Sequence, residues 1–160
     1  MIEQLQGFAA GFPEWAQWIA VMLVSAIPFV ESYFGSVIGV AIGLHPAVAI
    51  GAAILGNVIS MVAFVLSAHA TRSKVREVRG LGEVEETPRR QKLRNAFDRF
   101  GVPGVSLLGQ TLLPSQITSA AMVGFGASKN AVIFWQVISI ILWGVLFGVL
   151  ANLGLTALLS

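Results

Sequence analysis

The stretch Ile27-Pro28-Phe29-Val30-Glu31 interrupts a long apolar run and decides how the chain folds. Between Trp15 and Thr71 the sequence carries a single formal charge, which is Glu31. Proline breaks the hydrogen-bond ladder of a helix, and the core of a bilayer has no water to satisfy the freed backbone groups. A glutamate at that depth is costly unless it is paired, protonated or hydrated. We therefore expect a break in the chain here.

The composition predicts an integral membrane protein. Of the 160 residues, 56% are hydrophobic and 11% are charged, whereas soluble domains carry about 25% charged residues. There is no cysteine, and the two histidines, His45 and His69, are far apart and have no neighbouring carboxylates. We therefore expect no metal site and no cofactor. The absence of a Ser/His/Asp set and of a phosphate-binding loop argues against an enzyme.

The first half of the chain, residues 15–71, predicts a re-entrant hairpin followed by one full transmembrane helix. A crossing needs about 20 residues, and residues 47–70 supply them after a break at Leu44-His45-Pro46. Residues 15–44 would fold into two arms of about 15 residues each, which are too short to cross. These arms are expected to enter the bilayer and turn back near Pro28.

The alternative for this segment is one tilted helix that ends near Ala26 and is followed by a loose tail at the interface. The glycines Gly35, Gly39 and Gly43 favour the hairpin, because their spacing of four places small residues on one helix face.

The second half, residues 100–158, repeats this order with weak sequence similarity. Residues 101–128 form an uncharged run with Pro114 near its middle, which predicts a second re-entrant hairpin, and residues 130–158 are long enough for a full crossing. Two interrupted apolar segments in matching places are typical of a transporter-like inverted repeat. The chain is therefore expected to form one all-α membrane domain over residues 1–160.

A basic linker, residues 72–99, joins the halves and holds nine of the ten Lys and Arg residues. The positive-inside rule places it in the cytoplasm. With two hairpins, both termini then lie outside and the tenth basic residue, Lys129, lies inside. Four plain helices would put Lys129 outside, so the rule favours the hairpins.

Within the linker, Thr87-Pro88 has the pattern of a helix start. Leu93, Ala96, Phe97 and Phe100 follow with the spacing of one helix face, which predicts a short amphipathic helix on the inner leaflet. The alternative is a solvated loop.

Two runs of the sequence resemble known membrane families. SAIPFVESYFGSVIGVAIGLHP (25–46) resembles the signature of the small multidrug export proteins, a prokaryotic family distantly similar to the DedA family and to VTT-domain proteins. FDRFGVPGVSLLGQTLLPSQITSAAMVGFGASKNAVIFWQVISIILWG (97–144) is similar to the DedA pattern of an aromatic-glycine start, a central proline, a small-residue arm and a tryptophan-bearing helix. Together they cover roughly residues 20–150.

This resemblance implies two re-entrant hairpins in an inverted repeat and a multi-pass protein of the prokaryotic cytoplasmic (inner) membrane. It also implies transport, with flipping or scrambling of lipids and lipid carriers as the leading activities of the wider superfamily. The chain departs from the DedA pattern around the second proline. DedA members have arginines there, whereas this chain has Gln110, Thr111 and Gln116.

Glu31 is the leading site candidate, as a group at the hairpin tip that binds a proton or a cation. An apolar environment disfavours the charged form of a carboxyl group, and acids inside a membrane are functional by default. The alternative is a structural role in which Glu31 caps backbone amides of the hairpin. Asn57 and Ser60 lie one turn apart on helix 47–70, where they either face Glu31 or make a polar helix contact.

Gln110 and Gln116 are the candidates in the second half. They would bond to Glu31 across the pseudo-twofold axis, line a polar cavity, or satisfy the broken backbone. Pro28 and Pro114 are expected to shape the hairpins rather than to touch substrate.

Three functions are compatible with these patterns. The first is a transporter of small amphiphilic or cationic solutes that is proton-coupled through Glu31. The second is a DedA-like flippase or scramblase for a lipid or lipid carrier, and the third is a membrane scaffold without transport. Membrane lipids and a small-molecule or lipid substrate are the expected partners, and nucleic acid is not. A homodimer would use glycine faces formed by Gly35, Gly39, Gly43, Gly144 and Gly148.

Overall fold

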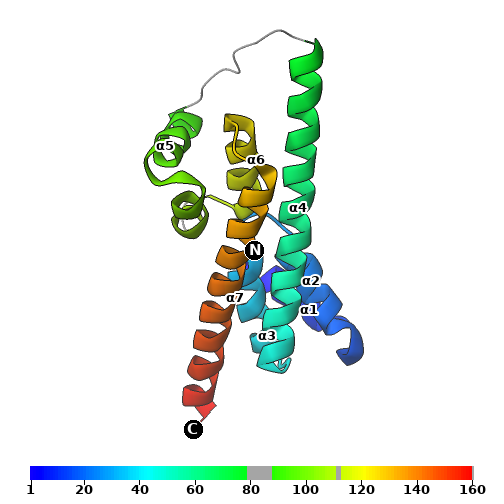
Figure 1. Cartoon of the computed structure of the whole chain (residues 1–160). Coiled ribbons are helices and arrows are strands. Elements are labelled where there is room, and N and C mark those ends of the chain that lie inside the picture. The colour runs from blue at the N-terminus through cyan, green and yellow to red at the C-terminus, as the bar shows by residue number, and fades with distance from the viewer. Residues whose placement is uncertain (79–87, 111–112, 160) are drawn as a thin grey trace. The chain divides into compact units, whose positions relative to one another are not determined.

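A computed structural model describes residues 1–78, 88–110 and 113–159 of the chain, and all of their side chains except those of residues 72–78, 89 and 90 (Figure 1). The described residues are all-α, which confirms the predicted class. The elements are α1 (Ile2–Ala10), the 3-10 helix η1 (Glu14–Ala16), α2 (Gln17–Ser25), α3 (Glu31–Ala41), α4 (Pro46–Val78), α5 (Pro88–Gly109), α6 (Ser115–Phe125) and α7 (Lys129–Leu159).

Two of these helices are long and apolar enough to cross a membrane, namely α4 over Pro46–Thr71 and α7 over Lys129–Leu159. They correspond to the predicted helices 47–70 and 130–158. α4 continues beyond its predicted end into the basic linker. Lysine, arginine and glutamate favour helix, and no glycine or proline occurs in this part of the linker before Gly80.

The chain divides into two compact units. The first unit comprises Met1–Ser60 and Ile140–Ser160, and the second comprises Met61–Ser139. Each unit therefore contains a pair of short helices, the first part of the long helix that follows this pair, and the last part of the other long helix. The two long helices are both shared between the units, which the sequence comparison of the halves did not predict.

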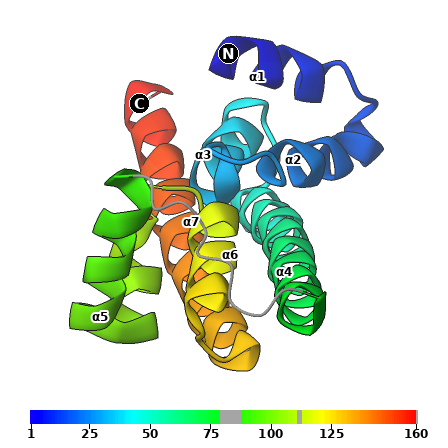
Figure 2. The same ribbon diagram turned by 90° about the horizontal axis from the view of Figure 1, so that it is seen from above.

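In the first unit, α2 and α3 pack against each other and α1 packs on both (Figure 2). Ala9, Ala20, Val24, Val30 and Ile38 form a small buried core between them. The arms are shorter than the predicted 15 residues, since α2 has 9 residues and α3 has 11. Part of the predicted length forms η1 before α2 and turns at residues 26–30 after it.

Glycines bring the helices of the first unit into close contact. A Cβ added at Gly56 of α4 would lie 1.9 Å from the carbonyl oxygen of Met22 on α2. A Cβ at Gly144 of α7 would lie 3.1 Å from Cβ of Ser32 on α3. Backbones this close leave no room for side chains between them, so small residues are required at these positions.

Four of the five glycines predicted to form dimer faces are buried inside the first unit. They are Gly35, Gly39, Gly144 and Gly148. Gly43 is exposed at the end of α3 with φ +93°. The small-residue faces are thus used within the chain, because the short helices need close neighbours. A homodimer stays a prediction, but these four glycines do not supply its contacts.

In the second unit, α5 and α6 pack against each other. α5 consists of two helical parts joined at Gly101, whose φ of +67° and ψ of −172° are not helical. Pro114 precedes α6, and Gly126 ends it with φ +115°. The chain therefore bends between the two parts of α5 and turns after α6.

The first part of α5 is the predicted linker helix. Pro88 begins it, whereas Thr87 and the rest of 79–87 lie outside the described residues. Leu93, Ala96 and Phe97 are partly buried, and Phe100 is exposed. The ring centroid of Phe97 lies 6.0 Å from that of Phe125 at the end of α6. Part of the predicted apolar face is thus used for packing within the second unit.

Candidate functional site

Glu31 is the first residue of α3 and is fully buried. The preceding turn is closed by the carbonyl oxygen of Ile27, which accepts from the amides of Val30 (3.1 Å) and Glu31 (3.3 Å). Pro28 lies inside this turn, where its missing N–H leaves no donor unsatisfied. The break predicted at Pro28 is therefore a tight turn, and the carboxyl group of Glu31 after it lies in the interior of the first unit.

The backbone at this turn is strained. Phe29 and Glu31 have φ values of +74° and +54°, and both are non-glycine residues. Such conformations cost about 1–3 kcal/mol each and persist where the surrounding structure holds them. Strained residues of this kind cluster at ligand sites and switch regions.

Hydroxyl groups on neighbouring elements hold this turn and the helix after it. Ser60 Oγ of α4 donates to the carbonyl oxygen of Ala26 at 2.8 Å. Ser32 Oγ, next to Glu31, donates to the carbonyl oxygen of Ile140 on α7 at 2.8 Å. Both long helices of the first unit therefore bond to the hairpin close to Glu31.

Asn57 is fully buried on α4, one helical turn before Ser60, and belongs to the same unit as Glu31. Tyr33 Oη donates to the carbonyl oxygen of Phe29 at 3.4 Å. Ser60 makes the polar helix contact that the sequence allowed. The predicted roles of Glu31 and Asn57 in binding stay predictions.

Gln110, Pro114 and Gln116 are buried in the second unit. Gln110 Oε1 accepts from Ser139 Oγ at 2.5 Å, and Gln116 Oε1 accepts from Ser115 Oγ at 3.4 Å. The two glutamines belong to a different unit from Glu31, so the expected bond across the two halves stays a prediction.

The second unit contains further buried polar residues that the sequence analysis did not name as site candidates. They are Ser106, Ser115, Thr118, Ser119, Gln136 and Ser139. The first unit has a smaller such set, Ser25, Ser32 and Ser36. Gln136 and Ser139 were detectable, because they lie one turn apart on an apolar helix in the same way as Asn57 and Ser60.

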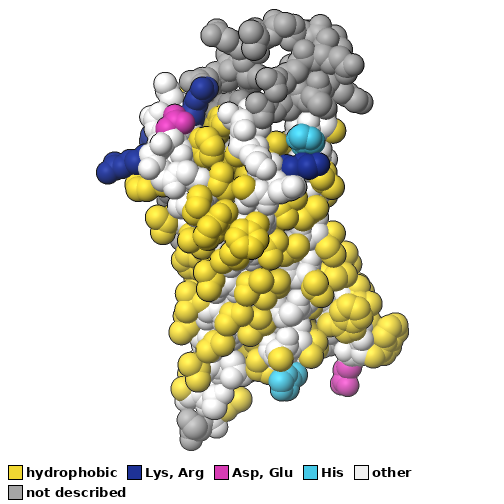
Figure 3. Space-filling view, viewed as in Figure 1, with side chains coloured by type: hydrophobic (Ala, Val, Ile, Leu, Met, Phe, Trp, Pro, Cys, Tyr) yellow, Lys and Arg dark blue, Asp and Glu magenta, His cyan; other side chains and the backbone are white. Residues whose placement is uncertain are grey.

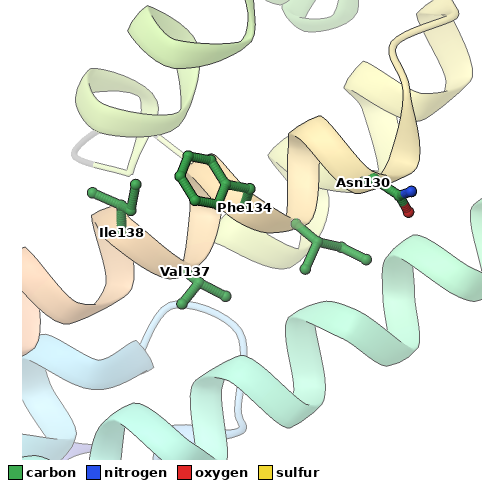
Figure 4. Close-up of a pocket in the computed structure, with 5 residues that line it drawn as sticks. Asn130, Phe134, Val137 and Ile138 are labelled. Carbon is green, nitrogen blue, oxygen red and sulfur yellow. The ribbon is translucent and has the colours of Figure 1, made fainter.

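A hollow lies along one side of the first turns of α7, with a volume of about 460 Å³ (Figure 4). Asn130, Ile133, Phe134, Val137 and Ile138 line it. Four of these five residues are hydrophobic, and their spacing of three and four residues is that of one helix face. The hollow is suited to apolar groups.

Among the described residues there is no group of three or more His, Cys, Asp or Glu side chains that could hold a metal ion. Comparisons of the chain with family models, curated proteins and solved structures gave no match. The resemblance to the small multidrug export and DedA families therefore stays an expectation.

Proposed function

We propose that the chain is a multi-pass transporter of the prokaryotic cytoplasmic membrane, related to the small multidrug export proteins. In this proposal α4 and α7 cross the bilayer. The hairpins α2–α3 and α5–α6 enter it from opposite sides as an inverted repeat. The linker between α4 and α5 is cytoplasmic, and both termini are outside.

The apolar surface of the chain supports this placement. Large hydrophobic side chains are exposed along most of α7, and hydrophobic atoms make up most of the visible face in Figure 3. On α7 they are Phe134, Ile141, Leu142, Val145, Leu146, Val149, Leu150, Leu153, Leu155, Leu158 and Leu159. A soluble protein rarely exposes a continuous apolar surface of this kind, whereas lipid tails would cover it.

Labelling of single cysteines tests the topology, and the absence of native cysteine gives a clean background. The variants are Glu3→Cys, His45→Cys, Lys129→Cys and Leu158→Cys. A membrane-impermeant maleimide added to intact cells is expected to label positions 3, 45 and 158, while position 129 reacts only after permeabilisation. Labelling of 129 from outside, with 45 protected, would argue for another arrangement.

Proton coupling is proposed to run through Glu31, and the observation that carries this is its position. A fully buried carboxyl group begins a helix directly after a strained turn, in a segment without any other formal charge. Protonation removes the charge and with it the main cost of burial. A turn that is strained with the group in one state can relax in the other, which couples the proton to a movement of the hairpin.

The substrates are proposed to be small amphiphilic or cationic solutes. In proteoliposomes with an internal pH-sensitive dye, addition of such a solute is expected to move protons. Glu31→Gln, which keeps the shape of the side chain, is expected to abolish this movement. Glu14→Gln is the matched control, since Glu14 is exposed in η1 and its loss should leave the movement unchanged.

Other outcomes would select a different function. Wild-type protein that moves no protons but equilibrates a fluorescent phospholipid between leaflets would be a scramblase. If Glu31→Gln changes stability, and neither solute nor lipid moves with the wild type, the chain is a scaffold.

A further inference from the structure

The buried polar side chains of the second unit meet at Gln110, at the end of α5. Ser106 lies one helical turn before it. On α7, Ser139 Oγ donates to Gln110 Oε1 at 2.5 Å, and Gln136 lies one turn before Ser139. This hydrogen bond fixes the direction of the Gln110 amide, so its Nε2 points away from Ser139.

α6 adds a third side to this cluster through Thr118. A Cβ placed on Gly109 would lie 3.4 Å from Thr118 Cγ2, so Thr118 packs directly beside the residue before Gln110. Helices α6 and α7 of one unit thus each place a polar residue, Thr118 and Ser139, beside the end of α5.

Four atoms of this cluster have no hydrogen-bond partner within the described part of the chain. They are Ser106 Oγ, Gln110 Nε2, Thr118 Oγ1 and Gln136 Oε1. Their side chains are between 0% and 4% exposed. A buried polar group without a partner costs about 1–3 kcal/mol, and most such groups in native proteins are bonded to protein or to water. Four such atoms in one unit therefore call for partners, which water or a bound ligand can supply.

The chemistry of the four atoms specifies an uncharged ligand. Gln110 Nε2 can only donate and Gln136 Oε1 can only accept, while the hydroxyls of Ser106 and Thr118 can do either. A cation would face the N–H group, and an anion would face the amide oxygen. A hydroxyl group donates once and accepts up to twice, so it can serve both the donor Gln110 Nε2 and the acceptor Gln136 Oε1, and it is about the size of a water molecule, roughly 30 Å³.

The apolar hollow described above lies on the neighbouring side of α7. Val137, which lines it, directly follows Gln136 in the sequence, and successive residues of a helix point about 100° apart. The second unit therefore presents an uncharged polar cluster and an apolar surface next to each other.

We infer that the second unit binds an uncharged amphiphile, with a hydroxyl group of its polar end against Ser106, Gln110, Thr118 and Gln136 and its alkyl chain in the hollow of α7. This assigns the substrate class of the transporter, and in that respect it rests on the proposed function.

Three probes with the same alkyl chain test the inference in proteoliposomes that contain the full chain. They are hexyl β-glucoside, hexyltrimethylammonium and hexyl sulfate, each added below micellar concentrations, with protein-free liposomes as the blank. The glucoside is expected to drive proton movement at a concentration at least tenfold lower than the two charged probes. Thr118→Val and Gln136→Leu are each expected to raise its half-maximal concentration about tenfold, because each leaves a ligand group unpaired.

Thr156→Val is the matched control, since Thr156 is exposed near the end of α7 and donates only to the carbonyl oxygen of Asn152. It should leave the response to the glucoside unchanged. Thr118→Val replaces a hydroxyl without a partner by a methyl group of similar size, so the ligand-free variant is expected to be at least as stable as wild type. Weaker binding without loss of stability separates a binding role from a structural one.

Several results would overturn the inference. If the ammonium probe moves protons and the glucoside does not, the transporter stands and the inference is wrong. If both variants respond to the glucoside as wild type does, the cluster holds water only. If no probe moves protons, equilibrium dialysis of radiolabelled hexyl glucoside with the purified protein decides. Saturable binding that Thr118→Val weakens supports the site, and its absence refutes it.

Discussion

The two helical hairpins stabilise the breaks between their helices in different ways. The first is fixed by glycines that bring backbones together, and it buries one acidic side chain, Glu31. The second unit buries a set of uncharged polar side chains, of which Gln110 bonds to Ser139. Within the described residues, the second unit buries no charged side chain.

This difference favours different roles for the two units in the proposed transporter. Close backbone contacts hold the turn before Glu31 in a strained conformation, which suits a group whose protonation releases that strain. A site built from amides and hydroxyls has unused hydrogen-bonding capacity, which suits ligand recognition. In the proposed transporter the proton would therefore act in the first unit and the substrate would bind in the second.

The largest effect is expected for Gly56→Ala in the first unit. The added Cβ would lie 1.9 Å from the carbonyl oxygen of Met22, a backbone atom that cannot move unless α2 separates from α4. We expect a loss of about 3 kcal/mol in the free energy of unfolding, the upper part of the range for overpacking. The measurement is the unfolding midpoint in detergent with increasing sodium dodecyl sulfate.

Gly51→Ala on the same helix is the control for this prediction. No atom lies within 4 Å of the position that its Cβ would take, so the variant is expected to be as stable as wild type or more stable by about 0.5–1 kcal/mol. Equal losses for Gly51→Ala and Gly56→Ala would show that helix propensity, and not close backbone contact, governs the first unit.

The sequence alone predicted the two long helices and the break at Pro28, because apolar length, proline and the lone charge are local signals, but it did not predict α1 or η1. It did not predict that Gly144 would pack against Ser32, since that contact joins residues far apart in the chain. The spacing of the glycines was recognised, but spacing shows only that a face is small and not which helix will occupy it. For that reason the sequence supports two uses of Gly35, Gly39 and Gly43, in the hairpin and in a dimer face, and the structure places Gly35 and Gly39 inside the first unit.

The candidate site was predicted unevenly for a similar reason. Glu31 stands out in any reading, because it is the only formal charge in its segment. Thr118 and Ser106 do not, because single hydroxyl residues are common in transmembrane helices and usually bond to their own backbone. Only the packing of α5, α6 and α7 shows that these hydroxyls are buried and that Gln110 bonds to Ser139.

An intermediate effect is expected for the two serines that bond the long helices to the hairpins. Ser60→Ala removes the donor to the carbonyl oxygen of Ala26, which is fixed in the strained turn and cannot turn to another partner. A loss of about 1 kcal/mol is expected. Ser139→Ala removes the donor to Gln110, whose amide can rotate about its own side-chain bonds, so a loss of about 0.5 kcal/mol is expected.

The same unfolding measurement compares the two variants. A greater loss for Ser139→Ala than for Ser60→Ala would contradict the view that the first hairpin is the more rigidly held. Glucoside-driven proton movement supplies a second comparison, because Ser139→Ala should weaken the response to the glucoside through Gln110.

The smallest effect on stability is expected at residues whose backbone has the left-handed conformation, with positive φ. Among the described residues, the second unit has only glycines at positive φ, Gly101 and Gly126, whereas the first has Phe29 and Glu31 in addition to Gly43. Phe29→Gly should remove about 1–2 kcal/mol of backbone strain and should cost about 0.5–1 kcal/mol through the greater freedom of the unfolded chain. A net gain in stability of about 0.5 kcal/mol is expected, since the Phe29 side chain is 57% exposed and contributes little to the core.

Phe134→Gly is the control for this last variant, because Phe134 is similarly exposed but lies in the regular helix α7. It is expected to lose about 1 kcal/mol. If Phe29→Gly raises the free energy of unfolding and Phe134→Gly lowers it, the backbone at Phe29 is strained whereas that at Phe134 is not. If Phe29→Gly is instead destabilising, the left-handed conformation at Phe29 is held by the side chain itself. The strain next to Glu31 would then not be available to drive a movement of the hairpin.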